Sequence, residues 1–383
     1  MTAFSFETTP RIVCARGAAA RLAEYVKGLG QRVLIVTDAA LVKAGLVEPA
    51  TRSLEAAGLR AFVFADVLPD PPEQRVLEAV AFARSHAVDV VVGLGGGSSM
   101  DTAKLVALLA NSTQHLQDIY GVGLATGRRL PLLQMPTTAG TGSEVTPISI
   151  VTTPDHEKKG VVSPLLYPDA AILDAELTMA LPPAVTAMTG VDAMVHAIEA
   201  YTSRIRKNPL SDTFAVQALR LLYANIEQAV TGGKDVEVRE RMLLGSLMAG
   251  MAFANAPVAA VHALAYPLGG HYGLPHGLTN ALMLVPTLRF NLPQASIAYA
   301  ELGRSILPDA AQAPDAVVAE RFISALAELL ARMPHARSLR DAKVPRADLP
   351  MLARDAMNVQ RLLVNNPREV TYEDALALYE QAW

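Results

Sequence analysis

The chain has 383 residues, of which 51% are hydrophobic and 18% charged, and its formal net charge is −4. This length exceeds the usual size of one hydrophobic core, so we expect two domains. The near-neutral charge and the lack of a lysine- and arginine-rich block argue against nucleic-acid binding. A single cysteine, Cys14, excludes an intramolecular disulfide and a thiolate zinc cluster, and we expect it to be a buried apolar residue.

The first half of the chain alternates strand and helix patterns. Short β-branched runs predict strands at 33–38, 61–64, 88–92 and 130–134, and apolar residues at helical spacing predict helices at 39–57, 72–85 and 99–110. Further strands are expected at 148–152 and 170–173. This alternation indicates βαβ units and a parallel sheet, and the continuous apolar runs indicate that helices cover both faces of that sheet.

The second half of the chain is helical throughout. After Pro183 the apolar residues recur at helical spacing nearly to the end, and Thr371 is a candidate N-cap for a last helix. We therefore place the domain boundary at 181–183, with an α/β domain over 1–182 and an all-helical domain over 183–383.

The cell compartment is predicted from what the sequence lacks. The first ten residues have neither the charged nor the apolar segment of a signal peptide, and no apolar run reaches the length of a membrane span. These features predict a cytoplasmic protein with no membrane partner.

A glycine-rich turn follows the third predicted strand. Gly93-Leu-Gly-Gly-Gly-Ser98 has four glycines in five positions and leads into a helix. Bare backbone N–H groups at a helix N-terminus can receive a pyrophosphate, although the same run would also make a tight turn with a capping serine. Asp38, which ends the first predicted strand, could accept a hydrogen bond from an adenosine ribose or cap the helix that follows it.

A second loop rich in hydroxyl groups follows the predicted strand at 130–134. Pro136-Thr-Thr-Ala-Gly-Thr-Gly-Ser143 offers four hydroxyls and two glycines. It could form a second wall of a phosphate or ribose pocket, or it could be a solvated loop.

Three of the eight histidines lie between His262 and His276, and a fourth, His196, comes four residues after Asp192. Asp192 and His196 share one helix face, and the glycines and Pro275 before His276 let it turn back toward His262. Three imidazoles and one carboxylate suit a catalytic Fe²⁺ or Zn²⁺ with an open coordination position, whereas each histidine taken alone fits a hydrogen-bonded core role better. His271 fits a fifth ligand, an acid–base group or a surface residue, and no role is assigned to His86, His115, His156 and His335.

Together these motifs resemble the iron-containing, group III alcohol dehydrogenases, which include lactaldehyde reductase and 1,3-propanediol dehydrogenase. The matching stretches are Gly95–Ser98 with Asp101 and Lys104, Pro136–Glu144, Gly190–Glu199, His262–Gly277 and the ending at Trp383. They span both halves of the chain and are specific in combination.

The resemblance implies a Rossmann-like N-terminal domain and an all-α C-terminal domain, the architecture of dehydroquinate synthase, with NAD and metal meeting in the cleft between them. It implies homodimers or larger homo-oligomers and NAD in preference to NADP, the acid at Asp38 favouring NAD. Iron is the expected metal, with zinc as the alternative. The implied metal ligands are Asp192, His196, His262 and His276, and the implied cofactor contacts are Asp38, Asp70, Gly96, Gly97, Ser98, Thr137, Thr138, Thr141 and Lys159.

The sequence departs from the family pattern at Tyr266. Many relatives have a histidine there, four residues after the one that matches His262, and that histidine is proposed to relay the alcohol proton. A tyrosine hydroxyl can pass a proton but is a poor base near neutrality. The relay is therefore expected to use Tyr266, His271, or water and the cofactor ribose.

The predicted reaction is hydride transfer between a metal-bound small alcohol, or the corresponding aldehyde, and nicotinamide. Phe253 is a candidate wall of the substrate pocket. The alternatives are a hydroxyacid–oxoacid transhydrogenase with tightly held NAD, a lyase resembling dehydroquinate synthase, and a non-catalytic dinucleotide-binding regulator. The lyase would need a cluster of basic residues for a phosphorylated acidic substrate, and the helical half has no such cluster near its histidines.

Overall fold

The structure is a computed structural model that describes residues 3–155 and 157–383, so His156 lies outside the described part. It forms two compact units, one from Thr8 to Ala180 and the other from Leu181 to Trp383 together with the described residues before Thr8. The described residues before Thr8 are part of the helical unit, and Asn255 on that unit binds the backbone of Glu7. Glu7 N donates to Asn255 Oδ1 over 2.8 Å, and Asn255 Nδ2 donates to Glu7 O over the same distance.

The α/β unit is built on a six-stranded parallel sheet in the order β1-β9-β6-β4-β2-β3. The strands are β1 (Ile12–Cys14), β2 (Arg32–Val36), β3 (Arg60–Phe64), β4 (Val90–Gly95), β6 (Leu132–Pro136) and β9 (Ala170–Leu173). The expected parallel sheet is therefore confirmed. Because the strands are parallel, β2, β4 and β6 all end at one edge, and that edge is where parallel sheets bind their ligands.

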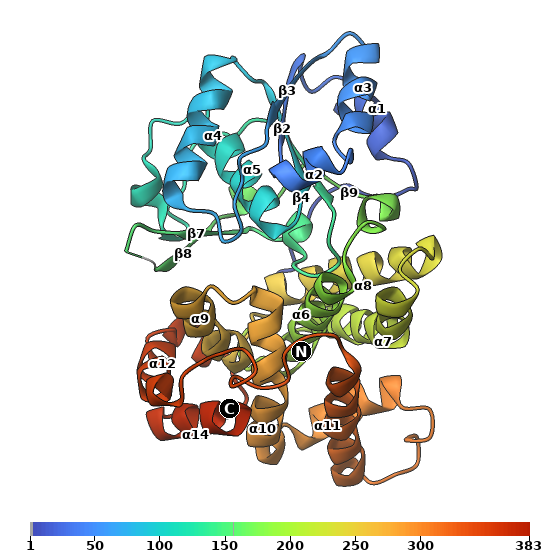
Figure 1. The fold of residues 1–383 in the computed structure, drawn as a ribbon, viewed down its shortest axis with the longest axis vertical. Helices are drawn as coiled ribbons and strands as arrows, with labels where there is room; N and C mark the ends of the chain where they lie inside the picture. Colours follow the sequence, from blue (N-terminus) through green and yellow to red (C-terminus); the bar gives the residue numbers. More distant parts are fainter. Residues whose placement is uncertain (1–2, 156) are drawn as a thin grey trace. The chain divides into compact units, whose positions relative to one another are not determined.

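Helices cover both faces of this sheet (Figure 1). The helices α4 (Glu73–Ser85) and α5 (Gly97–Leu109) contribute to one apolar core, and α1 (Leu22–Val26) and α3 (Glu48–Ala56) contribute to the other. All six residues of β4 are buried, as the continuous apolar run predicts.

Several elements differ from the sequence-based expectation. The helix expected over 39–57 is two helices, α2 (Ala39–Lys43) and α3, because Gly45 between them has a φ of +75°. The strand expected at 148–152 is confirmed as β7 (Ile148–Thr152), but it lies in a small second sheet with β5 (Gly121–Val122) and β8 (Lys158–Val162). The elements β1, α1, β5 and β8 were not predicted from the sequence. Cys14 is exposed, so the expectation of a buried cysteine is wrong: it ends β1, an edge strand that pairs only with β9.

The second unit contains only helices among its described residues. They are α6 (Pro183–Thr202), α7 (Pro209–Thr231), α8 (Val236–Asn255), α9 (Ala260–Tyr272), α10 (His276–Ile306), α11 (Asp315–Arg332), α12 (Leu349–Met357), α13 (Gln360–Leu363) and α14 (Tyr372–Ala382). Thr371 caps α14 in a capping box with Asp374, as predicted.

The length and composition of each helix in the described residues decide whether it could cross a membrane. No one of these helices is both long and apolar enough to cross a membrane, and a single pair, α8 and α9, meets the length and composition criteria only when taken together across a 105° bend.

Candidate active site

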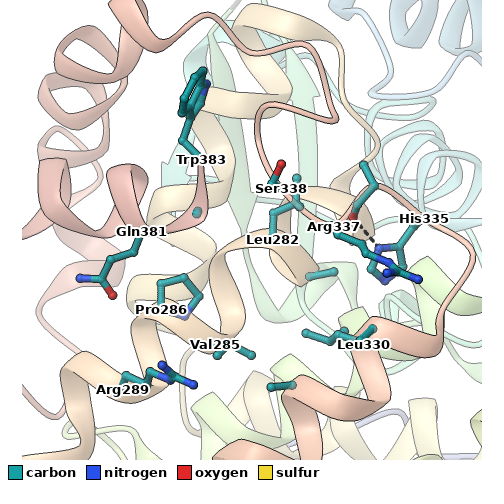
Figure 2. Close-up of a pocket in the computed structure, with 15 residues that line it drawn as sticks. Leu282, Val285, Pro286, Arg289, Leu330, His335, Arg337, Ser338, Gln381 and Trp383 are labelled. Carbon is teal, nitrogen blue, oxygen red and sulfur yellow. Dashed lines mark hydrogen bonds between the residues drawn. The ribbon is translucent and has the colours of Figure 1, made fainter.

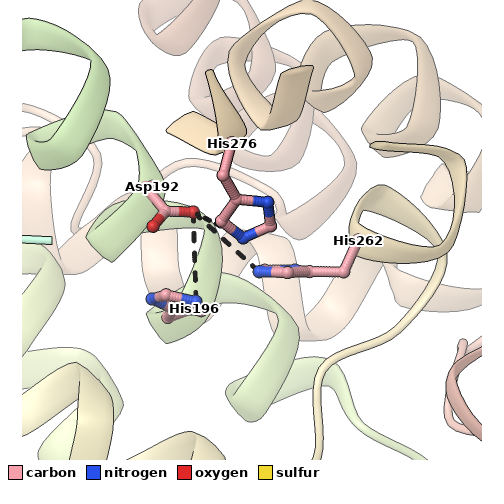
Figure 3. Close-up of side chains that lie close together, drawn as sticks. All are labelled: Asp192, His196, His262 and His276. Atoms are coloured by element: carbon pink, nitrogen blue, oxygen red, sulfur yellow. Dashed lines mark ion pairs between the residues drawn. The ribbon is translucent and has the colours of Figure 1, made fainter. Parts of the chain in front are cut away.

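The four predicted metal ligands lie together in the helical unit (Figure 3). Asp192 and His196 are one turn apart on α6, His262 is in the first turn of α9, and His276 is the first residue of α10. Asp192 Oδ1 is 3.9 Å from Nε2 of His196, 3.9 Å from Nε2 of His262 and 3.6 Å from Nε2 of His276. One potential ligand atom from each residue falls within 4.8 Å of the others, so the fold brings the whole predicted set into one cluster.

Two glycines determine where His276 sits. Gly273 ends α9 in the left-handed region, with a φ of +60°, and Pro275 is the N-cap of α10, so the chain reverses between His262 and His276. A Cβ on Gly277 would lie 2.3 Å from Met188 O, on α6. The first turn of α10 therefore packs directly on the backbone of α6, an approach that only glycine allows.

The electrostatics of the cluster suit a divalent cation. Asp192, His196 and His262 are 2%, 5% and 2% exposed. Burial tends to raise the pKa of Asp192, but the neighbouring imidazoles outweigh burial and hold this pKa below its usual value. Burial lowers the pKa of His196 to about 4, so its imidazole is neutral and keeps a lone pair. A carboxylate with neutral imidazoles is a donor set that fits Fe²⁺ or Zn²⁺.

Glu199, which the sequence analysis did not assign a role, orients His262. Its Oε2 faces His262 Nδ1 at 2.6 Å and accepts from Ala259 N over 2.9 Å, and its Oε1 accepts from Val261 N over 2.7 Å. A carboxylate at Nδ1 fixes the proton on that nitrogen, which leaves Nε2 free to bind a metal. The signal was present in the sequence, because Glu199 follows His196 by three residues and so lies near it on α6.

Asn280 also contacts the cluster and was also missed. Its Nδ2 donates to Asp192 Oδ1 over 2.5 Å and lies 3.1 Å from Nε2 of His262 and 3.3 Å from Nε2 of His276, while its Oδ1 is buried without a hydrogen-bond partner among the described residues. The amide nitrogen of Asn280 therefore faces three of the ligand atoms, and its buried oxygen is left with unused hydrogen-bonding capacity. Asn280 follows His276 by four residues, the same-face spacing that places it there.

Three other predicted residues have distinct surroundings. The Phe253 ring stacks on His196 with centroids 4.4 Å apart, so Phe253 is a wall of the cluster. The Tyr266 ring lies 6.0 Å from that of His276. His271 Nε2 lies 2.6 Å from Asp355 Oδ2 in a pair that is about 40% exposed, so among its alternatives the structure places it on the surface of α9.

The predicted phosphate-binding residues meet where β4 and β6 end. Gly96 is the N-cap of α5 and Gly97 its first residue, and Thr137 N donates to Gly95 O over 2.9 Å. A Cβ on Gly97 would lie 2.8 Å from Thr141 Cγ2, and one on Gly96 would lie 3.6 Å from Thr138 Cγ2. The glycine loop and the hydroxyl loop are therefore adjacent, and Ser98 lies in the first turn of α5 between them and the helix body.

These loops have polar groups suited to a phosphate. The positive end of the 13-residue helix α5 and the bare backbone at Gly96 and Gly97 favour an anion. Thr138 Oγ1 is buried and has no partner among the described residues, so the loop holds an unused hydrogen-bonding group at this place. Thr141 Oγ1 accepts from Ser143 N over 3.3 Å, which shapes the loop from within.

Lys104, on α5, connects this helix to the segment that follows β6. It is fully buried, and its Nζ donates to Ser143 Oγ over 2.8 Å, Thr146 Oγ1 over 3.1 Å and Ile148 O over 2.7 Å. Asp101, one turn earlier on α5, accepts from Ser143 Oγ over 2.6 Å. Three acceptors use all three protons of an ammonium group, so Lys104 is a charged cross-link between α5 and the loop after β6.

Burial shifts the pKa of both acids and of the base in this network. It lowers the pKa of Lys104 to about 8 against the charge of Asp101, and it raises the pKa of Glu144 to about 7. Burial likewise raises the pKa of Asp101, in opposition to the charge of Lys104. Such a network can hold the two loops at a fixed spacing, since each partner is costly to leave unpaired.

Asp38 caps a helix, which was one of its two predicted roles. Its Oδ1 accepts from Ala40 N over 2.9 Å and Leu41 N over 3.0 Å at the start of α2. It follows β2, whose end lies at the same sheet edge as the ends of β4 and β6.

Asp70 and Lys159 are associated with the hairpin of β7 and β8. Asp70 has a φ of +48°, and its Oδ1 is 2.6 Å from the Nζ of Lys158. Lys159, on β8, is 3.4 Å from Glu157 and half-exposed. Both side chains therefore form ion pairs with residues in or next to β8.

A parallel sheet with a glycine-rich loop at the carboxyl end of a strand, together with a largely buried Asp-His₃ cluster, is the combination expected of an oxidoreductase that uses a dinucleotide and a divalent metal. Comparison with known proteins gives the same class. The model of the iron-containing alcohol dehydrogenase family matches residues 9–175, and the model of the C-terminal part of the Fe-containing alcohol dehydrogenases matches residues 186–383. The chain belongs to the iron-containing alcohol dehydrogenase family.

Individual relatives cover nearly the whole chain. Long-chain-alcohol dehydrogenase 1 of Geobacillus thermodenitrificans is 38% identical, covering 96% of this chain and 93% of its own, and lactaldehyde reductase of Escherichia coli is 35% identical, covering 96% of each. The crystal structure of a 1,3-propanediol oxidoreductase matches with a TM-score of 0.96 at 34% identity, covering 100% of both chains.

A further solved relative bears on the cofactor. Sulfoacetaldehyde reductase from Bifidobacterium kashiwanohense, solved in complex with NAD⁺, matches with a TM-score of 0.88 at 28% identity over 100% of this chain and 99% of that one. Together the matches confirm the expected fold, family, enzyme class and cofactor classes.

Proposed function

We propose that Asp192, His196, His262 and His276 hold the catalytic metal of a small-alcohol dehydrogenase, and that the helical unit is the metal- and substrate-binding domain. The observation that carries this proposal is the mutual approach of their ligand atoms to within 4.8 Å, with three of the four residues buried and His276 partly exposed. When bound, the metal supplies Lewis acidity to the substrate oxygen, and nicotinamide carries the hydride.

The side chains around the ligands prepare the site for that chemistry. Glu199 fixes the ring of His262 through Nδ1, and Asn280 donates to Asp192. Phe253, stacked on His196, excludes water from one side of the cluster. This aromatic wall favours a small alcohol or aldehyde of low polarity over a polyanionic substrate.

The α/β unit is the proposed NAD-binding domain. Gly96, Gly97 and Ser98 would receive the pyrophosphate at the positive end of α5, and Thr137, Thr138 and Thr141 would line the cofactor. The unused Thr138 hydroxyl supports this assignment. Asp70 and Lys159, beside the β7–β8 hairpin, are assigned to the adenosine and the nicotinamide ribose by family resemblance alone.

Asp38 is the proposed determinant of NAD preference. Both of the backbone N–H groups that it caps donate to Oδ1, so Oδ2 can accept from a ribose hydroxyl while the cap persists. The same carboxylate would repel a 2′-phosphate. Asp38→Ala is expected to raise the catalytic efficiency with NADPH relative to NADH, measured as the ratio of the two kcat/KM values, and an unchanged ratio would contradict the assignment.

Tyr266 is the proposed residue of the proton path. Its ring lies beside that of His276, whereas the imidazole of His271 pairs with Asp355 at the surface. Tyr266→Phe is expected to lower kcat and to shift its pH profile, and His271→Gln to leave the profile unchanged. The reverse pattern would assign the relay to His271.

The metal assignment is tested with His276→Ala and the matched surface control His271→Ala. We expect His276→Ala to lose metal and turnover while it retains NADH binding, measured by metal analysis and by fluorescence titration of NADH. His271→Ala should keep normal metal content. Full metal occupancy in His276→Ala would refute the ligand set.

The reaction and substrate are tested with a panel of alcohols and aldehydes on protein reconstituted anaerobically with Fe²⁺ or with Zn²⁺. NAD(H)-dependent turnover is expected. Transfer between an alcohol and a carbonyl compound without added NAD would instead indicate a transhydrogenase.

The proposed assembly is a homodimer or a larger homo-oligomer in the cytoplasm. The support is the family resemblance for the assembly and, for the compartment, dependence on the NAD(H) pool. Light scattering of the purified protein and cell fractionation test these two statements, and a monomer or a secreted protein would contradict them.

A further inference from the structure

A pocket of about 450 Å³ lies in the helical unit, formed by residues that none of the proposed roles uses. Figure 2 shows that it is bounded by one side of α10, the end of α11, the segment after α11 and the end of the chain at Trp383. Its volume is in the range of sites that hold small molecules, about 300–1,000 Å³.

The charged side chains that line the pocket are all cationic. Arg289 lies on α10 and Arg337 follows α11, and none of the lining residues is acidic. Within the described chain neither guanidinium group has an ion pair, whereas nearby arginines such as Arg304, with Asp315, and Arg332, with Glu227, do. The carboxylate of Asp341 accepts a hydrogen bond from the backbone N of Arg337 over 3.3 Å and makes no ion pair with the Arg337 guanidinium within the described chain. Two unpaired guanidinium groups favour an anionic ligand.

The chain leaves hydrogen-bond acceptors unused at the same place. Pro286 and Pro293 lie inside α10 and have no N–H, so the carbonyls of Leu282 and Arg289 lack their usual partner four residues later. His335 Nδ1 lies 2.8 Å from Ala336 O, an acceptor, so that nitrogen carries the proton. Its Nε2 is buried without a partner among the described residues. Because these atoms are acceptors, they add polarity to the pocket and do not contact an anionic group themselves.

The rest of the wall combines aliphatic and aromatic surface with the polar side chains of Ser338 and Gln381, and part of it is held in place. Leu282, Val285 and Leu330 supply aliphatic surface. The Trp383 indole donates from Nε1 to Val344 O over 2.9 Å, and Arg340 stacks 3.9 Å above its ring. A wall that is already ordered loses little conformational entropy when a ligand binds.

We propose that this pocket is a second ligand site, separate from the Asp-His₃ cluster, which binds a small organic anion with an apolar body. The anionic group, a carboxylate or a phosphate ester, contacts Arg289 or Arg337, and the body lies against Leu282 and Leu330. Figure 2 places the two arginines well apart, so each is tested by itself.

The pocket is lined in part by α10, the helix that begins with His276. Five lining residues, from Ala281 to Arg289, belong to this helix, and the first of them follows Asn280, the donor to Asp192. The ligand would therefore contact the same helix that contributes to the cluster, through residues on its proline-containing part.

The test is calorimetric titration of the metal-loaded enzyme with NAD⁺ present. The probes are 4-phenylbutyrate, its neutral analogue 4-phenylbutyramide, and 4-phenylbutyl phosphate, which distinguishes a phosphate site from a carboxylate site. The variants are Arg289→Gln, Arg337→Gln and the double variant. The matched control is Arg321→Gln, an exposed arginine of α11 outside the pocket, which lowers the positive charge equally.

The expected result is one anionic probe bound with a Kd of about 1 mM or tighter and the amide bound at least about tenfold more weakly. Loss of the contacting guanidinium should weaken the anion about tenfold, and Arg321→Gln should leave its Kd unchanged. Three results would each overturn the proposal: equal affinity for the amide, an affinity that neither arginine variant changes, as binding at the metal cluster would give, or no binding of either anion.

Discussion

Glu199→Gln is predicted to weaken metal binding strongly although it replaces none of the four ligands. Glu199 is 4% exposed and accepts from two backbone N–H groups and from the imidazole of His262. Glutamine has nearly the same shape but only one acceptor oxygen. Its NH₂ group must therefore face at least one N–H donor at hydrogen-bond distance.

The magnitude follows from the three bonds. Hydrogen bonds to a charged group contribute roughly 1.5–3 kcal/mol each, and a buried donor left without an acceptor costs about 1–3 kcal/mol. If the amide oxygen keeps Val261 N, the bond to His262 Nδ1 is lost and its ring is no longer held with Nε2 toward Asp192. We expect metal affinity to fall about 10–100-fold, as is typical when the partner of a ligating histidine is removed. The metal-free protein should be destabilised by about 2 kcal/mol.

The assay is chelator competition for Zn²⁺ or Fe²⁺, together with urea unfolding of the metal-free protein. The control is Glu301→Gln, which removes a carboxylate that accepts from Tyr201 at an exposed site. Metal affinity within about twofold of the wild type in Glu199→Gln, with the expected loss of stability, would show that Glu199 supports the fold and does not orient His262.

Three further predictions concern one contact network in the α/β unit and two contacts in the helical unit. Lys104→Met should raise the KM for NAD more than it changes kcat. Because burial lowers the pKa of Lys104 to about 8 from 10.5, the unfolded chain holds more protons between these values and the unfolding free energy rises with pH there; the variant should lose this rise in urea titrations. Gly277→Ala should reduce metal content and stability, measured by metal analysis and thermal unfolding, because its Cβ would meet Met188 O; wild-type values would contradict the close packing. Asn280→Ala should weaken metal binding about tenfold in chelator competition through loss of the donor to Asp192, and unchanged affinity would exclude that role.

The two halves of the chain, their secondary structure class and the parallel sheet could be predicted from the sequence. The continuous Val-rich run of β4 is apolar on every residue because both faces of the sheet are covered, and the strand is buried throughout. The four metal-binding candidates could also be predicted, since their residue types and the helix break at Gly273 were visible without coordinates.

Only the tertiary structure showed how these residues meet. Glu199 and His262 are 63 residues apart, so no local pattern could pair them. Lys104 finds its acceptors in a loop about 40 residues later, and Cys14 is exposed because its strand lies at the edge of the sheet. The sequence by itself determined the amphipathic patterns and the types of donor atom, which depend on neighbours within a few residues. Which side chain orients which ligand depends on helix packing, and the close contact of Gly277 with the backbone of α6 is the kind of long-range approach that only the folded chain decides.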